Sequence, residues 1–370
     1  MDHQTPIPRI LVFPLPIQGN LNCMLKLAEL LCLSNLHVTF LNSHHNHARL
    51  LRYTNIQTRL SRYPGFRFET IADGLPNDHP RSGTRIMELV DAMRTVTKPL
   101  FEELLTRLVV EEGESPVTCL IVDGAIGFAL DAAEKVGIKV IFARPISPCY
   151  LWTLHCLPQL IEAGELPLQG NGDMDRKITQ VPSMETFLRA RDLPSFFRES
   201  EPSDPLVAHM ISETKQARRA YGFILNTFED LEAPHFSLFR SHCPNIYTLG
   251  PIHALLESKL PRDTTSFGDC SSLWQENKIC LSWLDTMPVK SVLYVSFGSL
   301  AMFTPEQILE IWHGLVNSEK ALLSMLAATH HPNLPCRYSL ATRNCFLSLA
   351  TDRHRFFITL WLPTLLQSLE

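Results

Sequence analysis

Two polar residues lie just past the ends of predicted strands, where they could take part in chemistry. Asn20 follows the apolar run "RILVFP" at residues 9–14, and Asp123 closes the apolar run "VTCLIVDG" at residues 117–124. A carboxylate can accept a proton from a substrate hydroxyl, whereas an amide near neutral pH only donates and accepts hydrogen bonds. If both residues face one crevice, Asp123 could serve as a base and Asn20 as a binding residue. The alternative, which is the more common case for any single residue of this kind, is an ordinary loop residue.

The first part of the chain alternates short apolar runs with helical periodicity. Continuous apolar runs typical of buried parallel strands lie at residues 9–14, 36–42, 65–71, 117–124 and 138–143. Predicted helices span residues 21–33, 84–110 and 125–137, the last closed by Gly137. This alternation predicts a doubly wound α/β domain, in which ligands bind at the carboxyl ends of the strands.

A second α/β unit begins in the last third of the chain. Residues 253–278 are polar and irregular, which predicts an interdomain linker. Residues 279–320 are interpreted as a short helix, a buried strand in "SVLYVSFGSL", and a helix capped by Thr304. Residues 321–370 contain no glycine and no clear alternation of strands and helices. We therefore predict a complete Rossmann-like domain over 1–252, a linker, the beginning of a truncated second domain, and a divergent tail.

Composition and charge exclude several classes of protein. The 370 residues are 45% hydrophobic and carry a formal net charge of -5 without a long basic run, so we expect no nucleic-acid partner. The ten cysteines are scattered without a CxxC pair, which indicates reduced thiols in the cytosol. No apolar stretch is long and unbroken enough for a signal peptide or a membrane span, so we expect a cytoplasmic protein without a membrane partner.

Two further groups of residues have types that occur in binding or metal sites. His44, His45 and His47 lie in "NSHHNHARL", but their spacing fits neither a helical i,i+4 pair nor a Cys/His quartet. We therefore predict a solvated loop there and expect no metal site. Trp152 and His155 share one face of a possible helix, where they could line a pocket or pack in the core. No GxGxxG follows the first strand, which disfavours a nicotinamide cofactor.

Four stretches, taken in order, closely resemble one known family. "PLPIQGNLNCMLKLAELL", "ILNTFEDLE", "YTLGPI" and "CLSWLDTMPVKSVLYVSFGS" resemble the plant family 1 UDP-glycosyltransferases, and the resemblance covers residues 7–320. Within the family, "FPLPIQGN", "SRYPGFRFETIADGLP" and "LPQLIEAGE" are most similar to an iridoid-pathway subgroup. The resemblance implies a GT-B fold, with a small acceptor in the first Rossmann-like domain and a UDP-sugar in the second. It also implies inverting glucosyl transfer with UDP-glucose as co-substrate, no other cofactor, and a monomer.

The resemblance assigns roles to Asn20 and Asp123. The family's base is usually a His directly after Gln-Gly, oriented by an Asp that corresponds to Asp123, and Asn20 stands at the position of this His. Asn is among the best helix N-caps, so a capping role is expected for Asn20. A binding role can coexist, with Asp123 acting as base directly or through water. General-base assistance contributes about 10²–10⁴-fold, and an acidic hydroxyl such as a hemiacetal would need it least.

Further positions follow from the same resemblance. Gly19 would permit close backbone approach beside the cleft, and Trp152 and His155 would line the acceptor pocket. Ser299 matches a serine that contacts the donor diphosphate. The family's donor box, which begins Trp-Ala-Pro-Gln, does not occur after residue 320. Two functions are therefore considered: a UDP-glucose-dependent glucosyltransferase, and a truncated non-catalytic homologue that has lost UDP-sugar binding.

Overall fold

The computed structural model of the 370-residue chain divides into two compact units. Unit 1 contains Met1–Leu75 and Leu89–Trp274, and unit 2 contains Pro76–Glu88 and Gln275–Glu370. The structure describes residues 7–79, 81, 85–110, 115–168, 173–199, 203–243, 245–261, 272–275, 279–296, 305–318, 321–327, 345–350 and 355–359.

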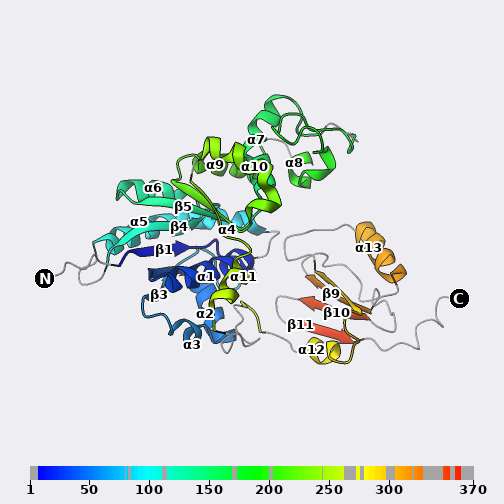
Figure 1. The fold of residues 1–370 in the computed structure, drawn as a ribbon, viewed down its shortest axis with the longest axis horizontal. Coiled ribbons are helices and arrows are strands. Elements are labelled where there is room, and N and C mark those ends of the chain that lie inside the picture. The colour runs from blue at the N-terminus through cyan, green and yellow to red at the C-terminus, as the bar shows by residue number, and fades with distance from the viewer. Residues whose placement is uncertain are drawn as a thin grey trace. The chain divides into compact units, whose positions relative to one another are not determined.

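Unit 1 is built on a seven-stranded parallel sheet (Figure 1). Its strands are β1 (Arg9–Phe13), β2 (His37–Ser43), β3 (Phe66–Ile71), β4 (Val117–Asp123), β5 (Lys139–Arg144), β6 (Gly222–Leu225) and β7 (Ile246–Thr248). Their order is β3-β2-β1-β4-β5-β6-β7, and every neighbouring pair is parallel. The predicted doubly wound α/β fold is confirmed. The strand order reverses between β1 and β4, and in such sheets ligands bind outside the strand ends at this switch point.

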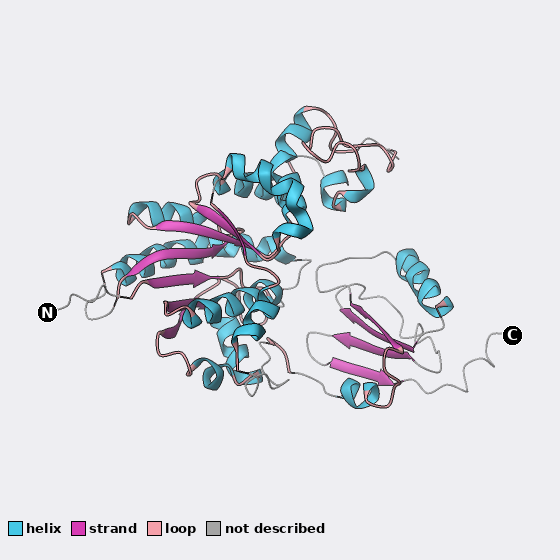
Figure 2. Cartoon of the chain, in the orientation of Figure 1, coloured by secondary structure: helices cyan, strands magenta, loops and turns pink. Residues whose placement is uncertain are grey.

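Helices cover both faces of this sheet (Figure 2). The helices from α1 to α11 are α1 (Gln18–Leu33), α2 (His44–Tyr53), α3 (Ile56–Leu60), α4 (Ile86–Ala92), α5 (Lys98–Val109), α6 (Phe128–Lys135), α7 (Pro148–Glu162), α8 (Ser195–Glu199), α9 (Pro205–Ala217), α10 (Glu229–His242) and α11 (Ile252–Lys259). A π-helical segment, Met93–Thr97, joins α4 to α5, and Ala190–Asp192 forms a 3-10 turn. Gly137 adopts a positive φ of 72° just after α6, as expected for a glycine that ends a helix. Among the described residues, no helix is both long and apolar enough to cross a membrane.

Helix α1 begins three residues earlier than the sequence predicted. Its N-cap is Ile17, which has extended backbone and no side-chain cap, and Leu21 N donates to Ile17 O at 3.0 Å. Asn20 is therefore the third helical residue, and the prediction that it caps the helix was wrong. The helix is fixed instead by its apolar face, since Leu21, Met24 and Leu25 are fully buried in the core.

The histidine-rich segment after β2 was predicted to be a loop, and this was also wrong. Residues His44–Tyr53 form α2, because the Ser43 hydroxyl caps the helix by accepting from Asn46 N at 3.1 Å. The three histidines lie in the first turns of this helix. Among the described residues, no group of His, Cys, Asp or Glu side chains could hold a metal ion.

Part of the segment predicted to be a linker packs into unit 1. Helix α11 buries Ile252 and Leu256 in the same apolar core as α1. Leu273 joins this core, and its backbone is held by Gln18 Oε1, which accepts from Leu273 N at 2.8 Å. The two apolar residues of α11 are four apart, which places them on one helical face.

Unit 2 contains a smaller sheet of four strands. Its elements include α12 (Ile279–Leu284), β8 (Val292–Ser296), α13 (Pro305–Asn317), β9 (Ala321–Ala327), β10 (Cys345–Ala350) and β11 (Arg355–Thr359). The strand order is β11-β10-β9-β8, with β10 and β11 antiparallel. The predicted helix, strand and helix at its start are confirmed, although Thr304 lies outside the described residues. Strand β8 was predicted to be buried, but it lies at the sheet edge and Tyr294 is 59% exposed.

Candidate functional site

Asn20 and Asp123 meet at the switch point of the larger sheet. The first turn of α1 follows β1, and Asp123 ends the neighbouring strand β4. Asn20 Nδ2 donates a hydrogen bond to Asp123 Oδ2 at 2.5 Å. The two residues that the sequence placed just past strand ends therefore share one crevice, because parallel neighbouring strands end at the same sheet edge.

Asp123 is a buried carboxyl with several fixed donors. It is 2% exposed, and its second oxygen, Oδ1, accepts from Ala125 N at 3.0 Å. Burial raises the pKa of Asp123, while the Asn20 amide, the backbone N–H groups of Ala125 and Leu15 and the charge of Arg144 oppose this rise. The carboxyl is thus held in one orientation, and the raised pKa makes it a better proton acceptor than an exposed Asp.

Two glycines after β4 allow two charged side chains to approach closely. A Cβ at Gly124 would lie 2.0 Å from Arg144 Nε, and a Cβ at Gly127 would lie 2.5 Å from Glu213 Oε2. Gly127 N donates to Glu213 Oε2 at 2.8 Å, a contact that joins the β4–α6 loop to α9. Any larger residue at either position would push the charged group away.

A cavity of about 390 Å³ opens beside this loop in unit 1. Leu15 and Ala125, whose backbone N–H groups face Asp123, form part of its wall. The rest comes from α4, the π-helical segment, the first residue of α5, the β4–α6 loop, α6 and α9. The charged lining residues are Arg94, Lys98, Asp131 and Glu213. Most small-molecule sites have a volume of about 300–1,000 Å³, so the cavity is large enough for a small organic acceptor.

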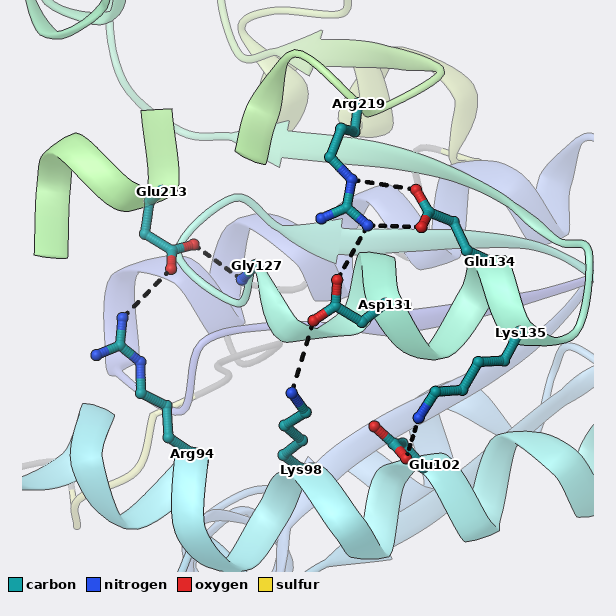
Figure 3. A network of polar contacts seen from close by, with 9 residues as sticks. All are labelled: Arg94, Lys98, Glu102, Gly127, Asp131, Glu134, Lys135, Glu213 and Arg219. Carbon is teal, nitrogen blue, oxygen red and sulfur yellow. Dashed lines mark hydrogen bonds and ion pairs between the residues drawn. The ribbon is translucent and has the colours of Figure 1, made fainter. Parts of the chain in front are cut away.

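Four charged residues in the lining of the 390 Å³ cavity form two pairs, and Figure 3 shows their contacts. Arg94 lies 3.6 Å from Glu213, on the opposite side of its carboxylate from Gly127, and Lys98 lies 3.6 Å from Asp131. Burial raises the pKa of Glu213 to about 7, against the pull of Arg144, the Gly127 N–H and Arg94. Glu213 therefore changes charge close to neutral pH, which is unusual for a carboxyl group.

His209 completes this group beside Arg94. Its Nδ1 lies 2.7 Å from an Arg94 guanidinium nitrogen, so the neutral ring is placed to accept from Arg94. Burial, together with the nearby charge of Arg94, lowers the pKa of His209 to about 4. The imidazole therefore stays neutral at physiological pH.

Trp152 and His155 lie on one face of α7, as the sequence predicted. Their rings stack with centroids 5.1 Å apart. Trp152 is 3% exposed and its indole N–H donates to Pro182 O at 3.0 Å, so much of its role is core packing. Both residues line a second, smaller cavity, not the 390 Å³ one.

Two further residues, Gly19 and Ser299, were predicted to belong to the site. Gly19 is exposed in the first turn of α1, and a Cβ there would meet nothing within 4 Å, so the fold itself does not require a glycine. Ser299 lies outside the described residues.

Sequence reasoning did not identify Arg144 and Glu213. The signal for Arg144 was an arginine ending the apolar run "KVIFAR", whereas nothing in α9 marked Glu213. Its burial depends on a loop 86 residues away in the chain.

Comparison with known proteins places these features in context. No family model matches the chain. The chain is 47% identical to 7-deoxyloganetic acid glucosyltransferase of Catharanthus roseus over 319 residues, which are 85% of this chain and 66% of that protein. It is 36% identical to UDP-glycosyltransferase 85A5 of Arabidopsis thaliana, covering 91% of this chain and 71% of that protein. The chain thus spans about two thirds of the length of these relatives.

Solved structures of plant enzymes share the fold. Os79 from O. sativa in complex with UDP superposes with a TM-score of 0.67 at 23% identity, covering 89% of this chain and 70% of that one. UDP-glucose:anthocyanidin 3-O-glucosyltransferase in complex with UDP gives a TM-score of 0.65 at 22% identity, covering 88% of this chain and 68% of that one. At such identities the likeness concerns the fold alone, and that fold is of the GT-B type.

Proposed function

The chain belongs to the plant UDP-glycosyltransferase family, and from this premise we propose that it is an inverting, UDP-glucose-dependent glucosyltransferase. The proposed acceptor is a hydroxyl group on a small, largely apolar molecule such as an iridoid or another terpenoid. The observation that carries the proposal is the contact between Asn20 and Asp123 at the switch point, beside a cavity of about 390 Å³. The printed name of the Catharanthus relative makes 7-deoxyloganetic acid the first acceptor to test.

In the proposed mechanism, Asp123 removes the proton of the acceptor hydroxyl directly or through one water. The acceptor oxygen attacks the anomeric carbon of glucose, the bond from that carbon to the UDP oxygen breaks, and UDP leaves with the bonding electrons. The raised pKa of Asp123 suits it to hold the proton.

Asn20 cannot be the base, because its amide does not take up a proton near neutral pH. Its amide nitrogen holds Asp123, and its amide oxygen is an acceptor that this contact does not use. The amide oxygen of Asn20 can therefore accept a hydrogen bond from the hydroxyl of the molecule that receives glucose, and this bond would orient the hydroxyl. A carboxylate is a weaker base than a histidine. An acidic hydroxyl, such as that of a hemiacetal, loses its proton more easily than an ordinary alcohol and would therefore depend less on a strong base.

The donor end of the reaction is assigned to unit 2. An anionic UDP leaving group would be held by helix N-termini and hydroxyl groups, and Ser299 is retained as a candidate contact to the diphosphate. UDP-glucose is the co-substrate, and no other cofactor is proposed. We further propose a monomer that acts in the cytosol.

A second candidate function is a non-catalytic homologue that binds acceptor but not UDP-sugar. It is favoured by the absence of the family's donor box from residues 321–370. Calorimetric titration of the purified chain with UDP separates the two functions. A dissociation constant in the micromolar range would exclude the non-catalytic candidate, whereas no heat of binding at millimolar UDP would exclude the enzyme.

A further inference from the structure

Arg144 is a buried arginine that the proposed mechanism does not use. It ends β5, is 9% exposed, and lies directly against Gly124. Among the described residues, its Nε has no hydrogen-bond partner. Burial lowers the pKa of Arg144, whereas the charges of Asp123 and Glu213 raise it. Burying a charged group without a matched partner is energetically costly, so a buried arginine of this kind is a candidate for binding an anionic ligand.

The two nearest carboxylates are already engaged with other donors. Asp123 accepts from Asn20 at 2.5 Å and from Ala125 at 3.0 Å. Glu213 accepts from Gly127 at 2.8 Å and pairs with Arg94 at 3.6 Å. Both carboxylates therefore act on Arg144 through space, and neither provides the two-pronged contact that a guanidinium makes with a carboxylate.

Arg144 faces a small cavity of about 30 Å³ between β5, β6 and helices α7, α9 and α10. A cavity needs roughly 10–15 Å³ to hold one water, so this one has room for a group about the size of a carboxylate head. Its other lining residues are Leu151, Trp152, His155, Thr214, Ala217, Arg218, Phe223, Phe239, His242 and Cys243.

The lining combines positive charge with aromatic surface. Arg218 lies 3.2 Å from His155 Nε2, and His242 packs edge-on against Trp152 with ring centroids 5.2 Å apart. Among the described residues that line this cavity, no side chain carries a carboxylate. Two arginines and no carboxylate in this lining favour an anionic group in the cavity.

We propose that Arg144 is a specificity-determining residue that binds the carboxylate of an acidic acceptor. This inference rests on the proposed function, because it names the class of acceptor whose hydroxyl reaches Asp123, and it places the acceptor's carboxylate in the 30 Å³ cavity that Arg144 lines. Asp123 is paired with Ala143 in the register of β4 and β5, so Arg144 is one residue beyond the partner of Asp123. Because successive side chains of a strand point to opposite faces, Arg144 lies against Gly124 on the face opposite to Asp123, at the same carboxyl edge of the sheet. In the proposed complex one acceptor spans this edge, with its hydroxyl at Asp123 and its carboxylate at Arg144.

The test compares 7-deoxyloganetic acid with its methyl ester, which keeps the hydroxyl but removes the negative charge. Dissociation constants are measured by calorimetry on the full chain, for the wild type, Arg144→Gln and the control Arg240→Gln. Arg240 is an exposed residue of α10 that pairs with Glu229. We expect the wild type and the control to bind the acid about tenfold or more tightly than the ester, and Arg144→Gln to bind both about equally.

The possible outcomes separate this inference from the proposed function. Equal binding of acid and ester by the wild type would overturn the role of Arg144 and leave the glucosyltransferase proposal standing. If Arg144→Gln still bound the acid more tightly than the ester, the role of Arg144 would also be overturned and the glucosyltransferase proposal would stand. If the wild type binds neither compound, the proposed acceptor class itself is wrong. Should Arg144→Gln not fold by circular dichroism, Arg144→Lys replaces it, with the acid preference reduced but not lost, because lysine keeps the charge without the planar fork.

Discussion

Asn20 Nδ2 lies 2.5 Å from Asp123 Oδ2, which ties the first turn of α1 to the end of β4. The family resemblance placed Asn20 where a histidine base usually stands, and the contact shows what the amide does in that position. It donates to the carboxyl that the histidine would otherwise contact. Of these two side chains, only the Asp123 carboxylate can take up a proton near neutral pH.

Restoring a histidine at this position should widen the range of acceptors. We expect Asn20→His to increase glucosyl transfer to ordinary alcohols by about 10–100-fold, because an imidazole held by Asp123 is a competent general base. Transfer to a more acidic hemiacetal hydroxyl should change little. Rates with a matched alcohol and hemiacetal acceptor measure this, with Asn20→Ala as the control that should help neither. An equal gain on both acceptors would contradict the assignment.

The titration of Glu213 should make the stability of the fold depend on pH. Its pKa is raised to about 7 from 4.5, so the folded state holds the proton more tightly than the unfolded state does. Its contribution to stability is therefore full below pH 4.5 and is lost as pH rises through about 7. The loss is at most about 3 kcal/mol in the free energy of unfolding.

Urea unfolding of Glu213→Gln at several pH values checks this. The free energy of unfolding of Glu213→Gln, relative to that of the wild type, should increase as the pH rises from 4.5 to 7. His209 has the opposite effect, because its lowered pKa makes stability rise with pH over part of the same range. Since His209 is present in both proteins, comparing the variant with the wild type isolates the contribution of Glu213. Glu134→Gln is the control, since Glu134 is exposed and paired with Arg219. A flat difference for Glu213→Gln would show that this carboxyl titrates normally.

Gly127, whose N–H donates to Glu213, should not tolerate a side chain. In Gly127→Ala the new Cβ would meet Glu213 Oε2 at 2.5 Å, which would displace the carboxylate and break its bond to the Gly127 N–H. We expect a loss of about 1–3 kcal/mol in the free energy of unfolding. Gly19→Ala is the matched control, because a Cβ there meets nothing within 4 Å and alanine favours a helix. Equal stability of the two variants would contradict the packing described for Gly127.

The strands of unit 1 could be predicted because buried parallel strands are continuous apolar runs that need no tertiary information to be recognised. The start of α1 could not be predicted, since Ile17, Gln18 and Gly19 carry no capping signal while Asn20 does. Helix α2 lacks a clear apolar stripe in its first turn and depends on the Ser43 cap. Local patterns thus predicted the sheet, but they misplaced the start of α1 and missed α2.

The site was predictable only where it follows from topology. Asn20 and Asp123 could be brought together because each follows a strand of one parallel sheet. The positions of Arg144 and Glu213 depend on glycines 124 and 127, which accept side chains from β5 and α9. Such contacts between distant segments leave no periodic trace in the sequence. The strands of residues 321–359 were missed because this stretch shows no clear alternation of strands and helices.

The central claim is that Asp123 accepts the proton of the acceptor hydroxyl. The most direct measurement is the rate at which the purified chain forms a glucoside from UDP-glucose and 7-deoxyloganetic acid, for the wild type and Asp123→Asn. The control is Asp175→Asn, which alters an exposed carboxylate paired with Arg189. We predict product with the wild type and the control, and a rate about 100-fold or more lower with Asp123→Asn. An Asp123→Asn variant that works at the wild-type rate would contradict the account.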